Sequence, residues 1–253
     1  MQTRTIVMLA IAAILGLVLG YGLGTNTTES ILWALGLGVV SVAGAYLALM
    51  RSGQAGAAPA DTQTNVADPP FARFLFQDTR AAAIWLPIRI YIGWDWFHAG
   101  WGKLTSATGW MDNGNAILGF WKGSVAIPAA GAGSPKISYD WWRGFIQTLI
   151  DSHADAWFSK VIVFGELAVG LALILGALVG IAAAGGILMN MAYLLTGATS
   201  SNPVLLALSI LLILAWKVAG WIGVDRWLLP LLGTPWNRGA MFKRDAAVTP
   251  ARS

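Results

Sequence analysis

Runs of apolar residues dominate the chain, and most have the length of a membrane-spanning helix. Such a helix needs roughly 20 predominantly apolar residues. Candidate runs lie at about 5–24, 31–50, 81–103, 160–178, 180–197 and 203–222. Charged residues are concentrated between these runs. The pattern predicts an all-α, polytopic membrane protein with six spans.

The first two runs are set apart from the rest by a change in composition. Residues 1–50 predict an N-terminal transmembrane hairpin, and we interpret its first helix as retained rather than cleaved. Gly16, Gly20 and Gly24 recur every four residues, which favours close packing on the second helix. Residues 51–70, rich in alanine, glycine and proline, predict a flexible linker.

The remaining runs predict a four-helix transmembrane bundle over residues 71–230. A short interfacial helix at 71–80 leads into its first span. The apolar stretch from Val161 to Leu195 is too long for one span, so we expect it to break near Gly176–Gly180. A long outer loop, 104–159, contains apolar, tryptophan-rich segments that we expect to lie on the membrane interface or to cap the bundle. Residues 231–253 form the predicted cytoplasmic tail.

Composition supports this class of protein. Hydrophobic residues make up 57% of the 253 residues and charged residues only 11%, whereas a soluble domain carries about 25% charged residues. Cysteine is absent, which excludes disulfides, thiolate metal sites and iron–sulfur clusters. We therefore expect no metal or covalent cofactor, and any redox chemistry must use a borrowed electron carrier.

The distribution of basic residues predicts the orientation. One side of the predicted membrane collects Arg4, Arg51, Arg73, Arg80, Arg226, Arg238, Lys243, Arg244 and Arg252. The other side has five, mostly in the outer loop. The positive-inside rule then places both termini in the cytoplasm. In a membrane protein, the net charge of +4 does not indicate nucleic-acid binding.

The third predicted span carries unusual chemistry in the stretch "RIYIGWDWFHAGWGKL" at 89–104. Isolated charges inside a bilayer cost about 2.5–3.5 kcal/mol each, so they normally face the bundle interior and find partners. Four ionisable side chains alternate there with three tryptophans: Arg89, Trp94, Asp95, Trp96, His98, Trp101 and Lys103.

Other spans bring polar groups to a similar depth. Glu166 lies about 9 Å below the outer surface, and Asp95 and His98 lie about 8–12 Å below it. Arg89 is deeper, but its long side chain can reach outward. The same outer half holds Asn190, Tyr193 and Asn202. We expect these groups to enclose a site near the outer leaflet.

Simpler interpretations of these residues stay open. Arg89 and Glu166 are consistent with a buried ion pair that only fixes the helix register. His98 alone is more often a hydrogen-bonded polar residue than a ligand, and a haem would need a second ligand such as His153. The tryptophans are mainly typical of an interfacial belt, and only Trp94, Trp96 and Trp101 are candidates for a pocket.

The stretches "RIYIGWDWFHAGWGKL", "GELAVGLALILGALV", "MNMAYLLTGATSSNP" and "AGWIGVDRWLLP" resemble the DoxX/DoxD family of four-helix membrane proteins. More closely, they are similar to the DoxD-type subunit of thiosulfate:quinone oxidoreductase. The likeness covers about residues 80–230. Its matching polar positions are Arg89, Lys103, Glu166 and Asn202. Residues 1–70 lie outside it and suggest docking to another protein.

The resemblance implies oxidation of thiosulfate to tetrathionate, with electrons passed to quinone in the cytoplasmic membrane of a prokaryote. In this hypothesis, Arg89 and Lys103 stabilise negative charge on the substrate or the semiquinone. Glu166, Asp95 or His98 carry protons. Trp96 or Trp101 stacks on the quinone ring, and Asn190, Tyr193 and Asn202 complete the binding residues.

Two other functions stay open. The extra hairpin and the long outer loop also suit a non-catalytic subunit of a larger respiratory or photosynthetic complex, in which the buried charges only hold the bundle together. A partner subunit would then dock on the hairpin or on the loop. A transporter is a weaker option, because the two halves show no inverted repeat.

Overall fold

The computed structural model describes residues 2–24, 26–51 and 68–233. Within these ranges the chain forms ten α-helices and one short 3₁₀ helix, with no strand. The prediction of an all-α protein is therefore confirmed. The greater part of the predicted linker (52–67) and of the predicted tail (234–253) lies outside the described residues.

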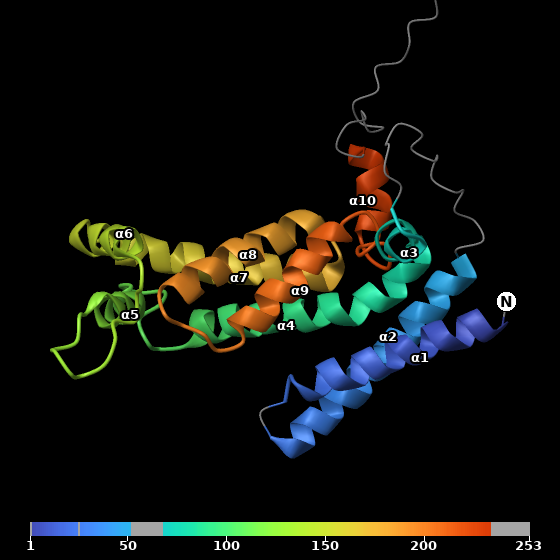
Figure 1. Cartoon of the computed structure of the whole chain (residues 1–253), viewed down its shortest axis with the longest axis horizontal. Helices are drawn as coiled ribbons and strands as arrows, with labels where there is room; N and C mark the ends of the chain where they lie inside the picture. Colours follow the sequence, from blue (N-terminus) through green and yellow to red (C-terminus); the bar gives the residue numbers. More distant parts are fainter. Residues whose placement is uncertain (1, 25, 52–67, 234–253) are drawn as a thin grey trace, which may run out of the picture.

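The N-terminal hairpin consists of α1 (Gln2–Tyr21) and α2 (Thr27–Arg51). Its glycines act as expected. A Cβ on Gly16 would lie 2.6 Å from the Ser41 hydroxyl oxygen, and one on Gly20 would lie 2.4 Å from the Trp33 carbonyl oxygen. Because these glycines have no side chain, the two helix backbones approach closely. The hairpin runs along one side of the molecule, against α4 (Ala82–Thr105) (Figure 1).

Four long helices form the main bundle. α4 lies along α7 (Asp155–Leu175), and α8 (Val179–Leu195) pairs with α9 (Asn202–Leu214). Their buried apolar side chains form one core, which includes Ile92, Leu173 and Leu212. The predicted break of the long apolar stretch occurs at Gly176, whose φ of +68° ends α7 in a left-handed turn.

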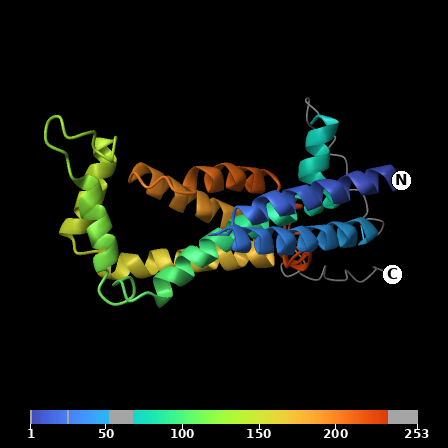
Figure 2. The same ribbon diagram turned by 90° about the horizontal axis from the view of Figure 1, so that it is seen from below.

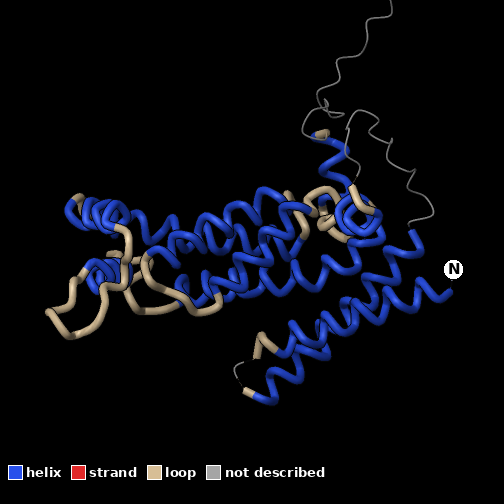
Figure 3. Tube along the Cα trace, viewed as in Figure 1, coloured by secondary structure: helices blue, strands red, loops and turns tan. Residues whose placement is uncertain are grey.

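Short helices close the two ends of the bundle. α5 (Asn115–Val125) and α6 (Asp140–Asp151) belong to the predicted outer loop and lie together at one end, as Figures 1 and 2 show. α3 (Pro70–Gln77) and α10 (Asp225–Leu232) lie at the opposite end, where α1 begins. Figure 3 shows most loops at these two ends, with the α1–α2 turn lying between them. We call the α5–α6 end the outer end and the α3–α10 end the inner end.

Six complete spans are not supported. Two described helices, Thr27–Leu47 and Asp155–Leu175, are long and apolar enough to cross a membrane, which is weak evidence for a membrane location. Three further apolar helices, Thr5–Tyr21, Val179–Leu195 and Asn202–Leu214, are shorter. The last has 13 residues and is about 20 Å long, less than a hydrocarbon core of about 30 Å. The sixth apolar run was predicted as one helix, but it turns after Leu214.

Candidate functional site

The site begins with a very close approach of α4 to α7. A Cβ on Gly170 would lie 2.4 Å from the backbone nitrogen of Phe97, and one on Gly93 would lie 2.9 Å from the Gly170 carbonyl oxygen. A Cβ on Gly100 would lie 3.0 Å from Leu167. Glycine-lined contacts of this kind let polar side chains on the two helices meet across the interface.

Lys103 and Glu166 meet at the outer end of this interface. The Lys103 ammonium donates to both carboxylate oxygens of Glu166, at 2.8 and 2.6 Å. The Tyr193 hydroxyl, from α8, donates to one of the same oxygens at 2.5 Å. The Glu166 side chain is 1% exposed and that of Lys103 is 20% exposed. Three helices therefore join in one charge-assisted cluster, which we call the Glu166 cluster (Lys103, Glu166 and Tyr193).

Aromatic rings enclose this cluster. The Trp96 ring stacks on that of Tyr193 with 6.4 Å between centroids. The Lys103 ammonium lies 5.2 Å from the centroid of the Trp110 ring, a distance at which a cation is attracted to an aromatic face. Tyr193 and Trp110 also line a cavity of about 60 Å³ beneath α5 and α6. At ~30 Å³ per molecule, that volume holds about two waters.

Three buried side chains near Tyr193 and along α9 have polar atoms without a hydrogen-bond partner among the described residues. They are the Trp96 indole nitrogen, both amide atoms of Asn190 and the Ser209 hydroxyl. A Cβ on Gly186, one turn before Asn190, would lie 3.1 Å from that indole nitrogen. A buried polar group without a partner costs about 1–3 kcal/mol. These groups can therefore hydrogen-bond a guest.

The other predicted site residues lie around the cluster but do not join it. Asp95 is half-buried and accepts a 2.8 Å hydrogen bond from the Ser201 hydroxyl. His98 is exposed and stacks on Trp94. Asn202 donates its amide to a backbone carbonyl of the preceding turn. Trp101 is 51% exposed and stacks on Phe97 rather than on the cluster.

Arg89 does not reach the outer end, contrary to expectation. Its side chain is 1% exposed, and one terminal nitrogen donates to the Ile222 carbonyl oxygen at 2.9 Å. A Cβ on Gly176 would lie 1.6 Å from the other terminal nitrogen. The guanidinium therefore lies against the α7–α8 turn, and Gly176 is about 15 Å along α7 from Glu166. Glu166 pairs with Lys103, so the alternative of an Arg89–Glu166 ion pair is wrong.

Asp225 is a structural residue that the sequence analysis missed. Its carboxylate accepts hydrogen bonds from the backbone nitrogens of Leu178 at 2.6 Å and Val179 at 2.9 Å. It therefore caps the first turn of α8, whose backbone N–H groups otherwise lack partners. The quoted stretch "AGWIGVDRWLLP" contains Asp225, but nothing in its spacing indicates a cap for a helix that starts 46 residues earlier.

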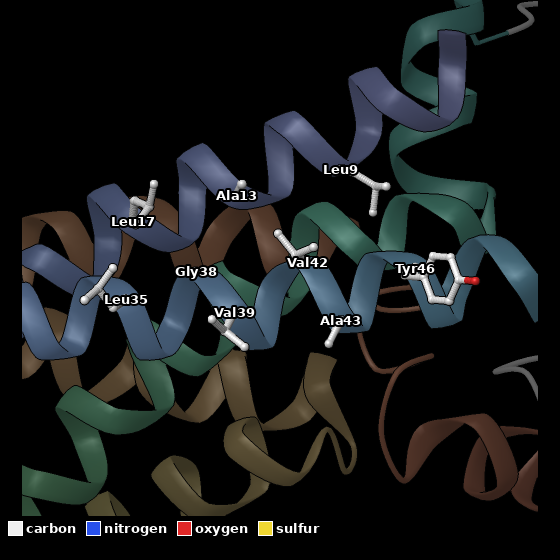
Figure 4. Close-up of a pocket in the computed structure, with 9 residues that line it drawn as sticks. All are labelled: Leu9, Ala13, Leu17, Leu35, Gly38, Val39, Val42, Ala43 and Tyr46. Carbon is white, nitrogen blue, oxygen red and sulfur yellow. The ribbon is translucent and has the colours of Figure 1, made fainter. Parts of the chain in front are cut away.

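An apolar groove of about 530 Å³ runs along the exposed face of the hairpin (Figure 4). Its middle is lined by small residues, Ala13, Gly38 and Ala43, and its rim by aliphatic side chains. Val39 and Tyr46 on this face are 70% and 51% exposed. The groove lies on α1 and α2, away from the Glu166 cluster.

The described residues contain no group of three or more His, Cys, Asp or Glu side chains that could hold a metal ion. Comparisons with protein-family models, with curated proteins and with solved structures find no match to this chain. The resemblance to the DoxX/DoxD family therefore stays a prediction.

Proposed function

We propose that this chain is an integral membrane subunit of an oxidoreductase that binds quinone at the Glu166 cluster. Thiosulfate is the electron donor that the resemblance implies. Two thiosulfate ions lose one electron each and join through a new S–S bond to form tetrathionate. Quinone takes up the two electrons and two protons to form quinol.

Exposed apolar side chains support a membrane location for the bundle. Ile181 and Leu188 on α8 are 70% and 72% exposed, and Phe164 on α7 is 55% exposed. Large contiguous apolar surfaces are rare on soluble proteins, whereas lipid covers them in a membrane protein. Embedding of the bundle does not depend on how many helices cross completely. We place it in the cytoplasmic membrane of a prokaryote, with both termini in the cytoplasm.

The observation that carries the proposal is the buried Glu166 carboxylate, held by one cation and one phenol. Reduction of a quinone to a quinol needs both charge stabilisation and proton delivery. Lys103 supplies a positive charge next to the forming anion. Tyr193 donates its proton to a quinone oxygen. The Glu166 carboxylate then takes up a proton from the aqueous side and passes it to the Tyr193 phenolate, and a second such cycle delivers the second proton. Trp96 and Asn190 offer an N–H and an amide to the second oxygen.

A quinone can reach the Glu166 cluster only if α5 and α6 move. The cavity of about 60 Å³ admits about two waters but no quinone ring. We infer that α5 and α6 move away from α8 when the ring enters. The cavity wall that opens consists of aromatic and aliphatic side chains, which suit contact with a lipid-soluble ligand. It includes Phe120, Trp121, Trp142 and Phe145.

Thiosulfate-dependent quinone reduction tests the proposal. Purified protein, with any co-purifying subunit, is assayed as wild type, Tyr193→Phe, Glu166→Gln and Lys122→Gln. Lys122 is exposed on α5 and serves as the control. We expect a loss of about 10²–10⁴-fold in kcat for the first two variants, the size of a lost general acid–base group, and none for the control. Unchanged kcat in both Tyr193→Phe and Glu166→Gln would refute the assignment.

The hairpin groove favours a second candidate, a non-catalytic subunit of a larger membrane complex. A smooth face of small residues suits close contact with a transmembrane helix of another protein. In that case Val39→Trp should release a partner that wild type retains in mild detergent. Leu188→Trp, on the exposed face of α8, is the matched control. Co-purification followed by mass spectrometry measures the partner, and equal retention in both variants would exclude this candidate.

A further inference from the structure

A second pocket lies at the inner end of the bundle, far from the Glu166 cluster. It has a volume of about 350 Å³ and is formed by α8, α9 and α10. Nearly all of its lining is apolar, with Ile181, Ile213, Leu229 and Leu232 among the contributors. Trp216 closes one side. The pocket therefore offers a space of hydrocarbon character beside the short helix α10.

The only carboxylate among the described residues that line this pocket does not present free negative charge to it. Both carboxylate oxygens of Asp225 accept hydrogen bonds, from the backbone nitrogens of Leu178 and Val179. It also lies close enough to Arg89 for electrostatic attraction between the two. The negative charge of Asp225 is therefore offset by the first turn of α8 and by a buried cation.

The Lys217 ammonium lies next to one wall of the pocket, and Arg226 lies on α10, which forms another wall. The Lys217 ammonium lies 5.8 Å from the centroid of the Trp216 ring, which lines the pocket. The Arg226 guanidinium follows Asp225 in the chain and lies 5.5 Å from the Trp221 ring and 5.9 Å from the Trp227 ring. Neither cation forms a salt bridge with a carboxylate in the described ranges. Both positive charges are thus available to an external anion.

This combination matches the chemistry of one class of ligand. Basic pockets between transmembrane helices on the cytoplasmic side bind anionic lipid head groups. Tryptophan side chains favour the level of the membrane interface, where head groups lie. A zwitterionic lipid gains less from two unpaired cations, because its own ammonium group repels them. The charge and the apolar lining therefore point to a lipid with a negatively charged head group.

We propose that this pocket binds one anionic phospholipid, with an acyl chain against Ile213 and Leu229 and its phosphate near Lys217 and Arg226. The proposal rests on the membrane part of the proposed function but not on quinone chemistry. The bound lipid would fill the space between α9 and α10 and hold α10 against α8.

Native mass spectrometry of the full chain tests this directly. The protein is released from mixed micelles that contain equal amounts of phosphatidylglycerol and phosphatidylcholine. We expect one phosphatidylglycerol to remain bound to wild type in preference to phosphatidylcholine. Each basic residue near an anionic lipid contributes roughly a fivefold change. The double variant Lys217→Gln/Arg226→Gln should therefore lower the bound ratio by about 30-fold.

Two further variants separate this site from general charge effects. Lys122→Gln/Lys136→Gln removes the same charge from exposed positions at the outer end and should leave the bound ratio unchanged. Leu229→Trp fills the pocket and should abolish retention with all cations in place. Equal retention of the two lipids by wild type, or an equal loss in the outer-end variant, would overturn the proposal. Protein that binds phosphatidylglycerol but fails to reduce quinone would refute only the redox proposal.

Discussion

Gly176→Ala is the substitution for which the structure gives the sharpest expectation. The glycine ends α7 with φ of +68°, a conformation that costs an L-residue about 1–2 kcal/mol. A new Cβ would also lie 1.6 Å from a terminal nitrogen of Arg89 and 3.1 Å from the Cα of Gly223. The guanidinium would have to leave its position.

The second cost of Gly176→Ala is the loss of the hydrogen bond that Arg89 donates. Its hydrogen bond to the Ile222 carbonyl at 2.9 Å involves a charged donor, and such bonds contribute about 1.5–3 kcal/mol. Together with the backbone cost, we expect Gly176→Ala to lower the free energy of unfolding by roughly 2.5–5 kcal/mol. For a chain of this size that is a fall in Tm of roughly 5–20 °C.

The assay is thermal unfolding of detergent-solubilised protein, followed by size-exclusion chromatography of the remaining folded fraction. Gly123→Ala in α5 is the control, because a Cβ there meets nothing within 4 Å. Alanine in that helix should stabilise by about 0.5–1 kcal/mol. A difference of less than about 1 kcal/mol between the two variants would contradict the close packing inferred at Gly176.

A double-mutant cycle separates the backbone cost from the contact. In Arg89→Met the guanidinium is gone, so Gly176→Ala should then cost little more than the left-handed conformation itself. We expect a coupling energy of about 1.5–3 kcal/mol. Additive effects would show that Arg89 does not hold the α7–α8 turn.

Three other predictions concern single positions. Gly170→Ala would place a Cβ 2.4 Å from the Phe97 backbone nitrogen, so it should separate α4 from α7 and lower Tm. Gly119→Ala is the control, because a Cβ there meets nothing within 4 Å. Asn190→Leu removes an amide without partners among the described residues and should raise the free energy of unfolding by about 1–3 kcal/mol while weakening quinone binding; a lower Tm would refute it. Partial burial acts to raise the pKa of Asp78, but the hydrogen bonds from Arg80 outweigh it and hold that pKa below 3.8. The carboxylate therefore stabilises the fold above about pH 4. Asp78→Ala should lower the free energy of unfolding by about 1 kcal/mol at pH 7 and by progressively less as pH falls below 3.8. Urea unfolding at pH 7 and at a pH below 3.8 checks this, and an equal loss under the two conditions would contradict it.

The helices could be predicted from the sequence because apolar run length and glycine position determine them. The break at Gly176 and the packing of Gly16 and Gly20 follow from local rules. The length of the last bundle helix could not be predicted equally well. The sixth apolar run reads as one span, yet α9 ends at Leu214, where the chain turns toward α10.

The site could be predicted only in part, because depth along a helix does not fix the direction of a side chain. Long side chains in a helix point toward its N-terminus. α4 begins at the inner end, so Arg89 extends inward, away from the Glu166 cluster. By the same rule, the Lys103 side chain points inward from the outer end of α4. α7 begins at the outer end, so the Glu166 side chain points outward and meets Lys103. Direction therefore decides which cation pairs with Glu166.

The cap that Asp225 supplies to α8 has a consequence for biogenesis. The ribosome makes the start of α8 46 residues before Asp225, so in the proposed membrane location the α7–α8 hairpin inserts with an unfinished turn. Until Asp225 is made, the first backbone N–H groups of α8 have no side-chain partner, and such a group is costly wherever water does not reach it. The start of α10 thus completes the first turn of α8 in a hairpin that was made earlier. A nascent chain stalled just before Asp225 should be more open to protease at the α7–α8 turn than one stalled after α10.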